Sequence, residues 1–395
     1  MSGAVDIGVG IIGASPGRSW AAMSHIPALQ ALSDYRLRAV ATGSAASAER
    51  AGTEFEVDGF DDPRALIEHP LVDLVVVAVK VTHHQQLVSQ ALAAGKMVFC
   101  EWPLGVDAYE AQSITDEAVR AGVPTVVGLQ SRFTAGVRQA AELVRSGHLG
   151  RVVSTSIVGS GLAWRRVTDP SHAYMYDGRS GATTLTVPAA HALDALNFVL
   201  GETIRYTAAF GLSSPYVEVA GEAEALTVTA PDQIALTAEL ASGAVASVFY
   251  RGGSSRAANL RWEINGTDGD LVLTSPSGNG NIQIGDLALA AGHGTDTKIV
   301  EIELPSPTAE VVNVPPGPAV AVAELYAAFA RDLRNGTQDA PTFVTALQLH
   351  RALAGIERGA HWTPPVAVLT GHRGQRVSPL TTTERKSPWD NSKAR

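Results

Sequence analysis

The chain contains a single cysteine, Cys100, among its 395 residues. One cysteine excludes an internal disulfide bond and a metal cluster held by several thiolates. No uninterrupted apolar run approaches the ~20 residues that a helix needs to cross a bilayer. The first residues also lack the charged and then apolar pattern of a signal peptide. We therefore expect a cytoplasmic protein with no membrane partner.

Charge is scarce as well, and acidic residues exceed basic ones. Charged residues make up 17% of the chain, and the formal net charge is −9. Non-specific nucleic-acid binding depends on Lys and Arg neutralising phosphates, so this composition argues against a nucleic-acid partner. Binding of a small anionic ligand is still compatible with this net negative charge, because a pocket can carry a positive local potential. Histidines and acids show no zinc spacing such as H-E-x-x-H, so no metal site is predicted.

Short apolar runs alternate with helical segments across residues 1–130. The run at 71–81 is continuously apolar and β-branched, as expected for a parallel strand covered on both faces. Such β–α alternation predicts an α/β domain with a doubly wound parallel sheet of the Rossmann type. The predicted strands are 6–13, 37–41, 71–81, 97–100 and 124–129, and the predicted helices are 19–32, 45–53, 85–94 and 108–121.

The pattern changes after residue 130, where strand-like runs separated by Gly, Ser and Asn turns become dominant. Residues 131–371 are predicted to form an α+β domain with a large, mostly antiparallel open sheet and helices at 135–146, 319–335 and 343–359. An open sheet face needs covering, so we expect a homo-oligomer, either a dimer or a tetramer. Residues 372–395 are polar and are predicted to be a tail.

The turn after the first predicted strand carries the candidate phosphate site. Dinucleotide folds place their pyrophosphate there, because the N–H groups and the dipole of the following helix attract anions. Gly13 occupies the first position of the G-x-G-x-x-G fingerprint, but Ser15 and Arg18 replace the second and third glycines. We predict that Gly13, Ser15, Pro16, Arg18 and Trp20 bind a dinucleotide; the alternative is an ordinary glycine-rich turn.

The end of the second predicted strand bears on which dinucleotide is bound. An acid at this place grips the ribose 2′-hydroxyl of NAD. Here Ala41 is followed by Thr, Gly and Ser44, with no carboxylate. Ser44 supplies a hydroxyl, and Arg18 and Arg50 are candidate cations. We therefore predict NADP as the cofactor, with NAD less favoured.

Six further motifs extend from the first predicted domain into the second. They are His84, Ala94-Gly95-Lys96, Glu101-x-Pro103-Leu104, Gly128 to Phe133, Leu143 to Gly150 and Gly266-Thr267-Asp268-Gly269. Together they resemble the glucose–fructose oxidoreductase, inositol dehydrogenase and MocA family. The resemblance implies a Rossmann half, a C-terminal half with a large open sheet, and nicotinamide-dependent hydride transfer on a small sugar, polyol or related carbonyl or hydroxyl compound. It places His84 and Glu101 near the cofactor.

Two departures from that family's pattern concern its chemistry. Trp102 stands where the family has a lysine that aids proton transfer, and Val187 stands where it has an aspartate. Trp102 would cover the nicotinamide or pack at the domain interface. Both changes, together with the segment around His25, resemble the subgroup of the fungal galactose-pathway repressor, a regulator that binds NADP without known turnover.

Three residues are candidates for proton transfer. His191 matches the family's pocket histidine, and a histidine can pass protons near neutral pH; the alternative is a structural histidine at the domain interface. Lys80 ends an apolar strand on the side where α/β proteins bind ligands, although it is otherwise a surface lysine. Tyr176, in the loop-like stretch 164–179, is the third.

The sequence therefore predicts an NADP-dependent oxidoreductase for a small-molecule substrate. Two alternatives stay open. One is a non-enzymatic NADP-binding sensor or regulator, because the family's lysine is missing. The other is a redox-neutral enzyme that retains its cofactor.

Overall fold

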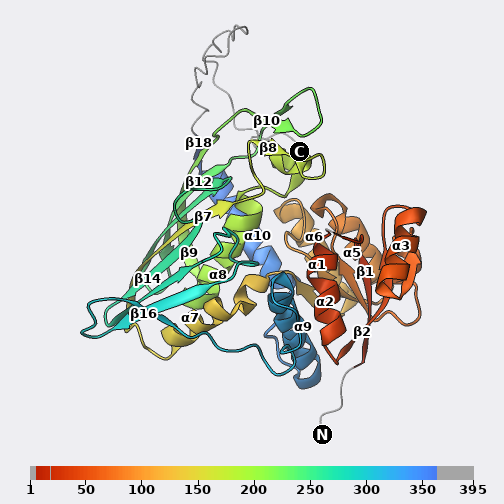
Figure 1. Cartoon of the computed structure of the whole chain (residues 1–395), viewed down its shortest axis with the longest axis horizontal. Coiled ribbons are helices and arrows are strands. Elements are labelled where there is room, and N and C mark those ends of the chain that lie inside the picture. Colours follow the sequence, from red (N-terminus) through yellow and green to blue (C-terminus); the bar gives the residue numbers. More distant parts are fainter. Residues whose placement is uncertain (1–5, 18, 363–395) are drawn as a thin grey trace.

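The computed structural model describes residues 6–17 and 19–362. Figure 1 shows a helix-flanked N-terminal sheet on one side, a larger open sheet on the other, and helices between them. A small lobe lies where the two halves meet, and it contains the strands β8 (Val167–Thr168), β10 (Tyr216–Val219) and β11 (Leu226–Thr227).

The N-terminal sheet is parallel, with the strand order β3-β2-β1-β4-β5-β6. This order confirms the predicted doubly wound Rossmann architecture. Its strands are β1 (Ile7–Ile12), β2 (Tyr35–Ala41), β3 (Asp58–Phe60), β4 (Leu74–Val77), β5 (Met97–Cys100) and β6 (Thr125–Val127). Its helices are α1 (Trp20–Met23), α2 (His25–Ala31), α3 (Ala45–Phe55), α4 (Pro63–Ile67), α5 (His84–Ala93) and α6 (Ala108–Ala121).

Helices bury both faces of this sheet, which is why β1 and β4 are apolar and buried at every position. Helices α4, α5 and α6 share one apolar core with one set of alternating strand residues. Helices α1 and α2 share the other core with α9 (Pro318–Asn335). The face of the parallel sheet that is covered by the first two helices is thus also covered by α9, which comes from near the C-terminal end of the chain.

The second sheet has nine strands in the order β17-β16-β15-β14-β7-β13-β12-β9-β18. The β7–β13 and β9–β18 pairs are parallel and the others antiparallel, which confirms a large, mostly antiparallel sheet. The strands are β7 (Val152–Gly161), β9 (Thr203–Gly211), β12 (Gln233–Leu240), β13 (Val245–Gly252), β14 (Leu260–Gly266), β15 (Gly269–Thr274), β16 (Ala288–His293), β17 (Val300–Ile302) and β18 (His361–Trp362).

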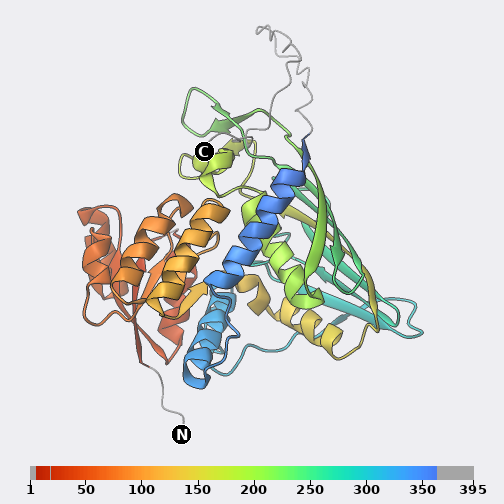
Figure 2. The ribbon, with the colours of Figure 1, turned by 180° about the vertical axis from the view of Figure 1, so that it is seen from behind.

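One face of the nine-stranded sheet packs on α7 (Ala135–Arg145), α8 (Ala190–Leu200) and α10 (Phe343–Gly359). Figure 2 shows α10 running between the Rossmann helices and this sheet. Along β12 buried and more exposed residues alternate, as they should in a strand with one covered face. None of the helices within 6–17 and 19–362 is long and apolar enough to cross a membrane.

Three details differ from the predicted elements. The strand predicted at 71–81 is only β4, because residues 78–80 leave the sheet and lead into a 3₁₀ turn at Val81–His83. The helix predicted at 19–32 is two helices, because the Ser24 hydroxyl donates back to the Trp20 carbonyl at 2.7 Å and the chain bends there. Strand β3 and helix α4 were not predicted, since both are short.

Candidate functional site

The turn between β1 and α1, where a phosphate site is predicted, is tightly packed at Gly13. Gly13 has a φ of +105° and is packed against the end of β4. A Cβ atom at Gly13 would lie 2.3 Å from the Ala78 carbonyl oxygen, so a larger residue does not fit. Its N–H donates to the Ala41 carbonyl oxygen at 2.8 Å, which joins the turn to the end of β2.

The other predicted residues of this turn surround the start of α1. The Ser19 hydroxyl caps the helix by accepting from the Ala22 N–H at 3.2 Å, and it donates to the Ser15 carbonyl oxygen at 2.5 Å. Trp20 is half-buried, and its indole Nε1 is buried with no hydrogen-bond partner among the described residues. Ser15 is exposed and Pro16 is half-buried. Arg18 lies outside the described residues.

The end of β2 presents hydroxyl groups and the N-terminus of α3. Ser44 is the N-cap of α3, and its Oγ accepts from the Ser47 N–H at 3.3 Å. The Thr42 and Ser47 hydroxyls are 2.6 Å apart. The first turn of α3 contains no acidic residue. An anion at this end of β2 would therefore meet a helix N-terminus and three hydroxyl groups.

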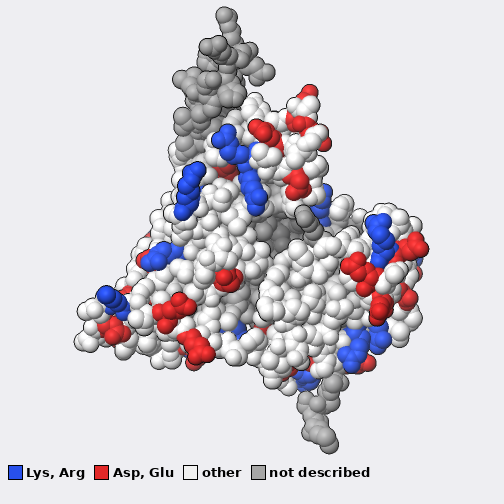
Figure 3. Space-filling model, in the orientation of Figure 1, with Lys and Arg blue, Asp and Glu red and all other residues white. Residues whose placement is uncertain are grey.

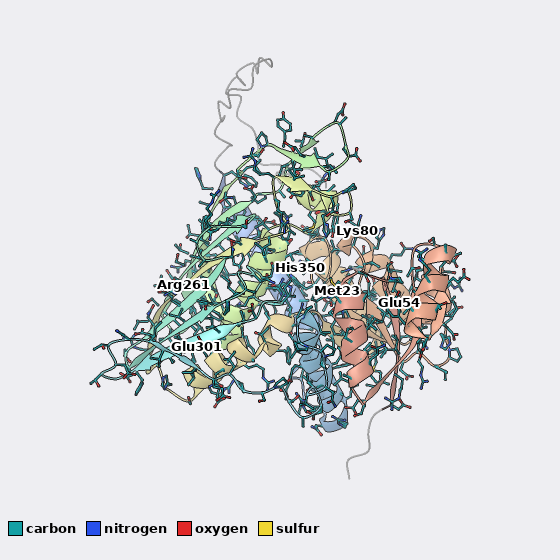
Figure 4. All side chains as sticks on the ribbon, viewed as in Figure 1. Met23, Glu54, Lys80, Arg261, Glu301 and His350 are labelled. Atoms are coloured by element: carbon teal, nitrogen blue, oxygen red, sulfur yellow. The ribbon has the colours of Figure 1, made fainter. Side chains whose placement is uncertain are left out.

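Lys80 follows β4 and is exposed, with its Nζ 4.7 Å from the centre of the Tyr174 ring in the small lobe. Figure 4 shows Lys80 on the edge of the Rossmann half that faces this lobe. This cation–π contact links the two parts. Tyr176, in the same lobe, donates its hydroxyl to the Arg165 carbonyl oxygen at 2.7 Å, and burial raises its pKa. The structure thus leaves Tyr176 engaged in its own lobe.

His84 is buried beneath the carboxyl ends of β4 and β5. Its Nδ1 lies 2.9 Å from the Pro103 carbonyl oxygen and its Nε2 lies 3.1 Å from that of Val79. Burial lowers the pKa of His84, which leaves a neutral ring with one N–H to donate. These contacts favour a role in holding the two strand ends together.

Glu101 and Trp102 follow β5 directly, and their side chains take different directions. The Glu101 Oε1 accepts from the His25 Nε2 at 2.8 Å, and its side chain is 14% exposed. Trp102 is buried, donates from Nε1 to the Thr186 carbonyl oxygen at 2.7 Å, and lies against the His350 ring, with ring centres 4.6 Å apart. Figure 4 places His350 in the interior between the two sheets.

His191 lies in the first turn of α8 and is almost fully buried. Burial lowers its pKa to about 3, so the imidazole is neutral at physiological pH. Its Nδ1 has no hydrogen-bond partner among the described residues, and the same holds for the buried Thr184 Oγ1 and Gln130 Oε1. Buried polar atoms are rarely left unpaired in proteins. Such atoms are therefore candidates for ligand contact.

The neighbouring Asp194 forms a bidentate ion pair with Arg132, with Nε–Oδ2 and Nη2–Oδ1 distances of 2.8 and 2.6 Å. Burial opposes the charge of Arg132, but the Asp194 carboxylate outweighs it, so the pKa of the guanidinium is raised. Since Arg132 belongs to the crossing between the two halves and Asp194 to α8, the pair fixes the helix that carries His191.

The structure therefore gathers Gly13, Lys80, Glu101 and Trp102 at the carboxyl ends of the parallel strands, where α/β proteins bind ligands. Figure 3 shows that Lys, Arg, Asp and Glu of the described residues gather at the rim of the viewed face. The roles of the predicted site residues stay predictions. Sequence reasoning did not find the partners of Glu101 and Trp102, because their contacts join segments 76 and 84 residues apart.

Comparison with known proteins agrees with this division of the chain. Residues 7–129 match the model described as "Oxidoreductase family, NAD-binding Rossmann fold", and residues 136–275 match the model described as "Gal80p, C-terminal domain". A crystal structure of a super-repressor mutant of Gal80p from Saccharomyces cerevisiae has a TM-score of 0.79 and 24% identity, covering 90% of this chain and 96% of that chain. At this identity the likeness concerns the fold.

Two curated relatives differ in what they do. "Dehydrogenase aclE" of Aspergillus oryzae is 35% identical over 172 residues, which are 42% of this chain and 46% of that protein. The "galactose/lactose metabolism regulatory protein GAL80" of Kluyveromyces lactis is 27% identical over 306 residues, which are 72% of this chain and 66% of that protein. Each alignment thus covers less than two thirds of the relative. The chain joins a Rossmann domain of the GFO/IDH/MocA oxidoreductase family to a C-terminal domain of the Gal80p type.

Proposed function

We propose that this protein binds NADP at the carboxyl ends of its parallel strands and transfers a hydride between the nicotinamide and a small sugar, polyol or related carbonyl or hydroxyl compound. The observation that carries the proposal is the Gly13 turn, where a Cβ atom would be 2.3 Å from a backbone oxygen. Such a turn brings the backbone close to a pyrophosphate at the start of the following helix. The nicotinamide supplies the hydride chemistry when it is bound.

The preference for NADP rests on the end of β2. No carboxylate follows Ala41, where NAD-binding proteins hold the 2′-hydroxyl. Ser44 instead caps α3, whose first turn has no acid to repel a 2′-phosphate. At the end of β5, Glu101 supports the bound dinucleotide through Oε2, which has no hydrogen-bond partner among the described residues and can accept from a hydroxyl.

Proton transfer is assigned to His191. Its neutral imidazole accepts a hydrogen bond or a proton at Nδ1, and it cannot serve as an acid at rest because burial lowers its pKa to about 3. Lys80 is exposed after β4, the strand beside the one that leads to Trp102, and it would supply the positive charge that the family's lysine gives at that position. Its contact with Tyr174 positions this charge beneath the small lobe.

A second function is favoured by Trp102. Its Nε1 is bound to the Thr186 carbonyl and its ring is buried against His350, so it provides no proton at the cleft. A protein that binds NADP without turnover, and regulates a partner or senses the cofactor, would need no such group. The similarity of residues 136–275 to the Gal80p C-terminal domain supports this alternative. A redox-neutral enzyme that keeps its cofactor is a third.

Fluorescence titration followed by a turnover screen separates these functions. NADPH and NADH are titrated into the purified chain, and NADP⁺ reduction is then measured with a panel of sugar and polyol hydroxyl compounds, the direction in which a neutral His191 accepts the proton released from the hydroxyl. His191→Ala is compared with His69→Ala, since His69 lies near Lys96, before β5, at the opposite end of the sheet. We expect turnover that His191→Ala abolishes and His69→Ala preserves, with cofactor affinity intact in both.

Tight NADPH binding without turnover across the panel would contradict the oxidoreductase and favour the regulator. Turnover that persists in His191→Ala would contradict only the assignment of proton transfer to His191 and would leave the oxidoreductase function standing. Release of a product with the absorbance of the bound cofactor unchanged at the end of the reaction would favour redox-neutral chemistry. The open face of the nine-stranded sheet leads us to propose a homo-oligomer, which light scattering measures directly.

A further inference from the structure

We propose that His25 and Tyr326 are positioning residues, which fix one oxygen of Glu101 through a single imidazole tautomer and leave the other oxygen free to accept from hydroxyl groups of the bound dinucleotide. This inference rests on the proposed cofactor site and adds a device that holds it. The three side chains come from α2, α9 and the end of β5. They form a chain of hydrogen bonds through the core of the Rossmann half.

His25 is the centre of this chain. Its side chain is completely buried, with Nε2 2.8 Å from Glu101 Oε1 and Nδ1 2.7 Å from the Tyr326 hydroxyl. Its ring meets the edges of Phe99 and Tyr326, with centres 5.1 and 5.7 Å apart. Both ring nitrogens are therefore engaged, and neither can turn to another partner without breaking this packing.

The donors and acceptors around His25 select one tautomer. Burial raises the pKa of Tyr326 far above its usual value, so its hydroxyl keeps its proton. Its acceptor among the described residues is the Nδ1 of His25. On the other side of the ring, the carboxylate of Glu101 can only accept. Nδ1 must then carry a lone pair, and the ring N–H is on Nε2, where it donates to Glu101. Tyr326 and Glu101 thus both favour the tautomer in which His25 presents a donor to the carboxylate.

Two features show that the polypeptide chain is packed around the Glu101 carboxylate at the end of β5. Gly128 lies against it, and a Cβ atom there would be 2.8 Å from Oε1 and 3.0 Å from Oε2. Glu101 itself follows β5, next to β4 and near the Gly13 turn. A carboxylate whose Oε1 already has a donor can offer Oε2 to a ligand hydroxyl at low entropic cost, because its rotamer is fixed.

The ionisable groups near this chain are few among the described residues. Tyr326 is influenced by Tyr35 and Glu101, and the buried His84 and Cys100 are also influenced by Glu101. Tyr35 donates its hydroxyl to the Tyr326 carbonyl oxygen at 2.7 Å and does not contact His25. Tyr35→Phe is therefore a matched control. It removes a buried hydroxyl that also contacts α9 at Tyr326, but it leaves the hydrogen bonds between Tyr326, His25 and Glu101 in place.

The first test reads the tautomer itself and needs no cofactor. Nitrogen-15 NMR of the histidine-labelled full-length protein distinguishes protonated from unprotonated ring nitrogens, and the His25 signals are assigned by their loss in His25→Gln. We expect Nε2–H with a bare Nδ1 in the wild type and in Tyr35→Phe. In Tyr326→Phe the Nδ1 signal should shift, because this nitrogen loses its donor, while Nε2–H is retained by the Glu101 carboxylate. A proton on Nδ1 in the wild type, or an Nδ1 signal that is the same in Tyr326→Phe, would overturn the inference.

The second test measures NADPH affinity by fluorescence. Removal of a hydrogen bond to a charged group typically weakens binding about tenfold. We expect such a loss for His25→Leu, near-normal affinity for His25→Gln, whose amide retains a donor, and no change for Tyr35→Phe. Tyr326→Phe should weaken binding less than His25→Leu, because His25 still donates to Glu101 although its ring is no longer held at Nδ1.

The outcomes separate this inference from the function on which it rests. Wild-type protein that binds neither NADPH nor NADH would contradict the proposed function, while the NMR result would still test the tautomer. NADPH binding that is intact in both His25→Leu and Tyr326→Phe would overturn the positioning role alone. Thermal unfolding of each variant identifies any that fails to fold. If Tyr326→Phe does not fold, the tautomer of His25 in the wild type and in Tyr35→Phe tests the inference.

Discussion

The Arg132–Asp194 ion pair makes a quantitative prediction, because its two partners differ in burial. The side chains are 20% and 3% exposed, respectively. Removal of one partner from a buried pair typically costs about 3–5 kcal/mol, since it leaves an uncompensated charge. Arg132→Met strands the fully buried Asp194 and should lower the free energy of unfolding by about 4 kcal/mol. Asp194→Asn leaves an arginine that water can reach, so it should cost less, about 2–3 kcal/mol.

Urea unfolding of the two single variants and the double variant measures this effect. The double variant removes both charges, so we expect it to be more stable than Arg132→Met alone. The coupling energy from the cycle should be about 2 kcal/mol or more for a pair in direct contact. Equal costs for the two single variants, or a coupling energy near zero, would refute the reasoning from burial. Arg132 also lies over the Phe198 ring at 5.6 Å, so Phe198→Leu is a control for lost packing.

Three further variants test other parts of the structure. Burial raises the pKa of Glu357 to about 7, so the folded protein holds this proton more tightly and its stability falls as pH rises from about 4.5 to 7. Glu357→Gln should therefore raise the free energy of unfolding by up to about 3 kcal/mol at pH 8 and change it little at pH 4. Thermal unfolding at the two pH values measures this difference. Trp102→Phe leaves the Thr186 carbonyl without its donor and should cost about 1–3 kcal/mol in urea unfolding, while NADPH affinity stays the same. Gly13→Ala should weaken NADPH binding at least tenfold in a fluorescence titration, whereas Gly355→Ala, whose Cβ would meet only the flexible Arg358 guanidinium at 3.9 Å, should not.

The sequence predicted the Rossmann half well because its signals are local. The apolar β-branched core of β4 and the glycine ending α6 at Gly122 are recognisable within a few residues. Its failures are local as well. The 71–81 strand was extended by apolar residues that leave the sheet, and the break at Ser24 depends on a hydroxyl–carbonyl bond that periodicity does not reveal.

The candidate site was harder to predict, since its contacts join distant segments. Gly13 was predicted from its place in a motif and His191 from the family resemblance, and both stay predictions. The partner of Glu101 comes from α2, and the next residue of that chain of hydrogen bonds comes from α9. A buried tyrosine in an alanine-rich helix, such as Tyr326, shows no sign in the sequence that its hydroxyl meets a histidine 301 residues away. Likewise, the direction of Trp102 follows from the Thr186 carbonyl, a backbone group with no sequence signature.

The most direct test of the central claim is isothermal titration calorimetry of the purified full-length chain with NADPH and with NADH. We predict saturable binding of one dinucleotide per chain, tighter for NADPH, and strongly reduced in Gly13→Ala while Gly355→Ala binds as the wild type does. Absence of heat for both dinucleotides at high protein concentration, in protein that carries no nucleotide after purification, would contradict a cofactor site at the β1–α1 turn.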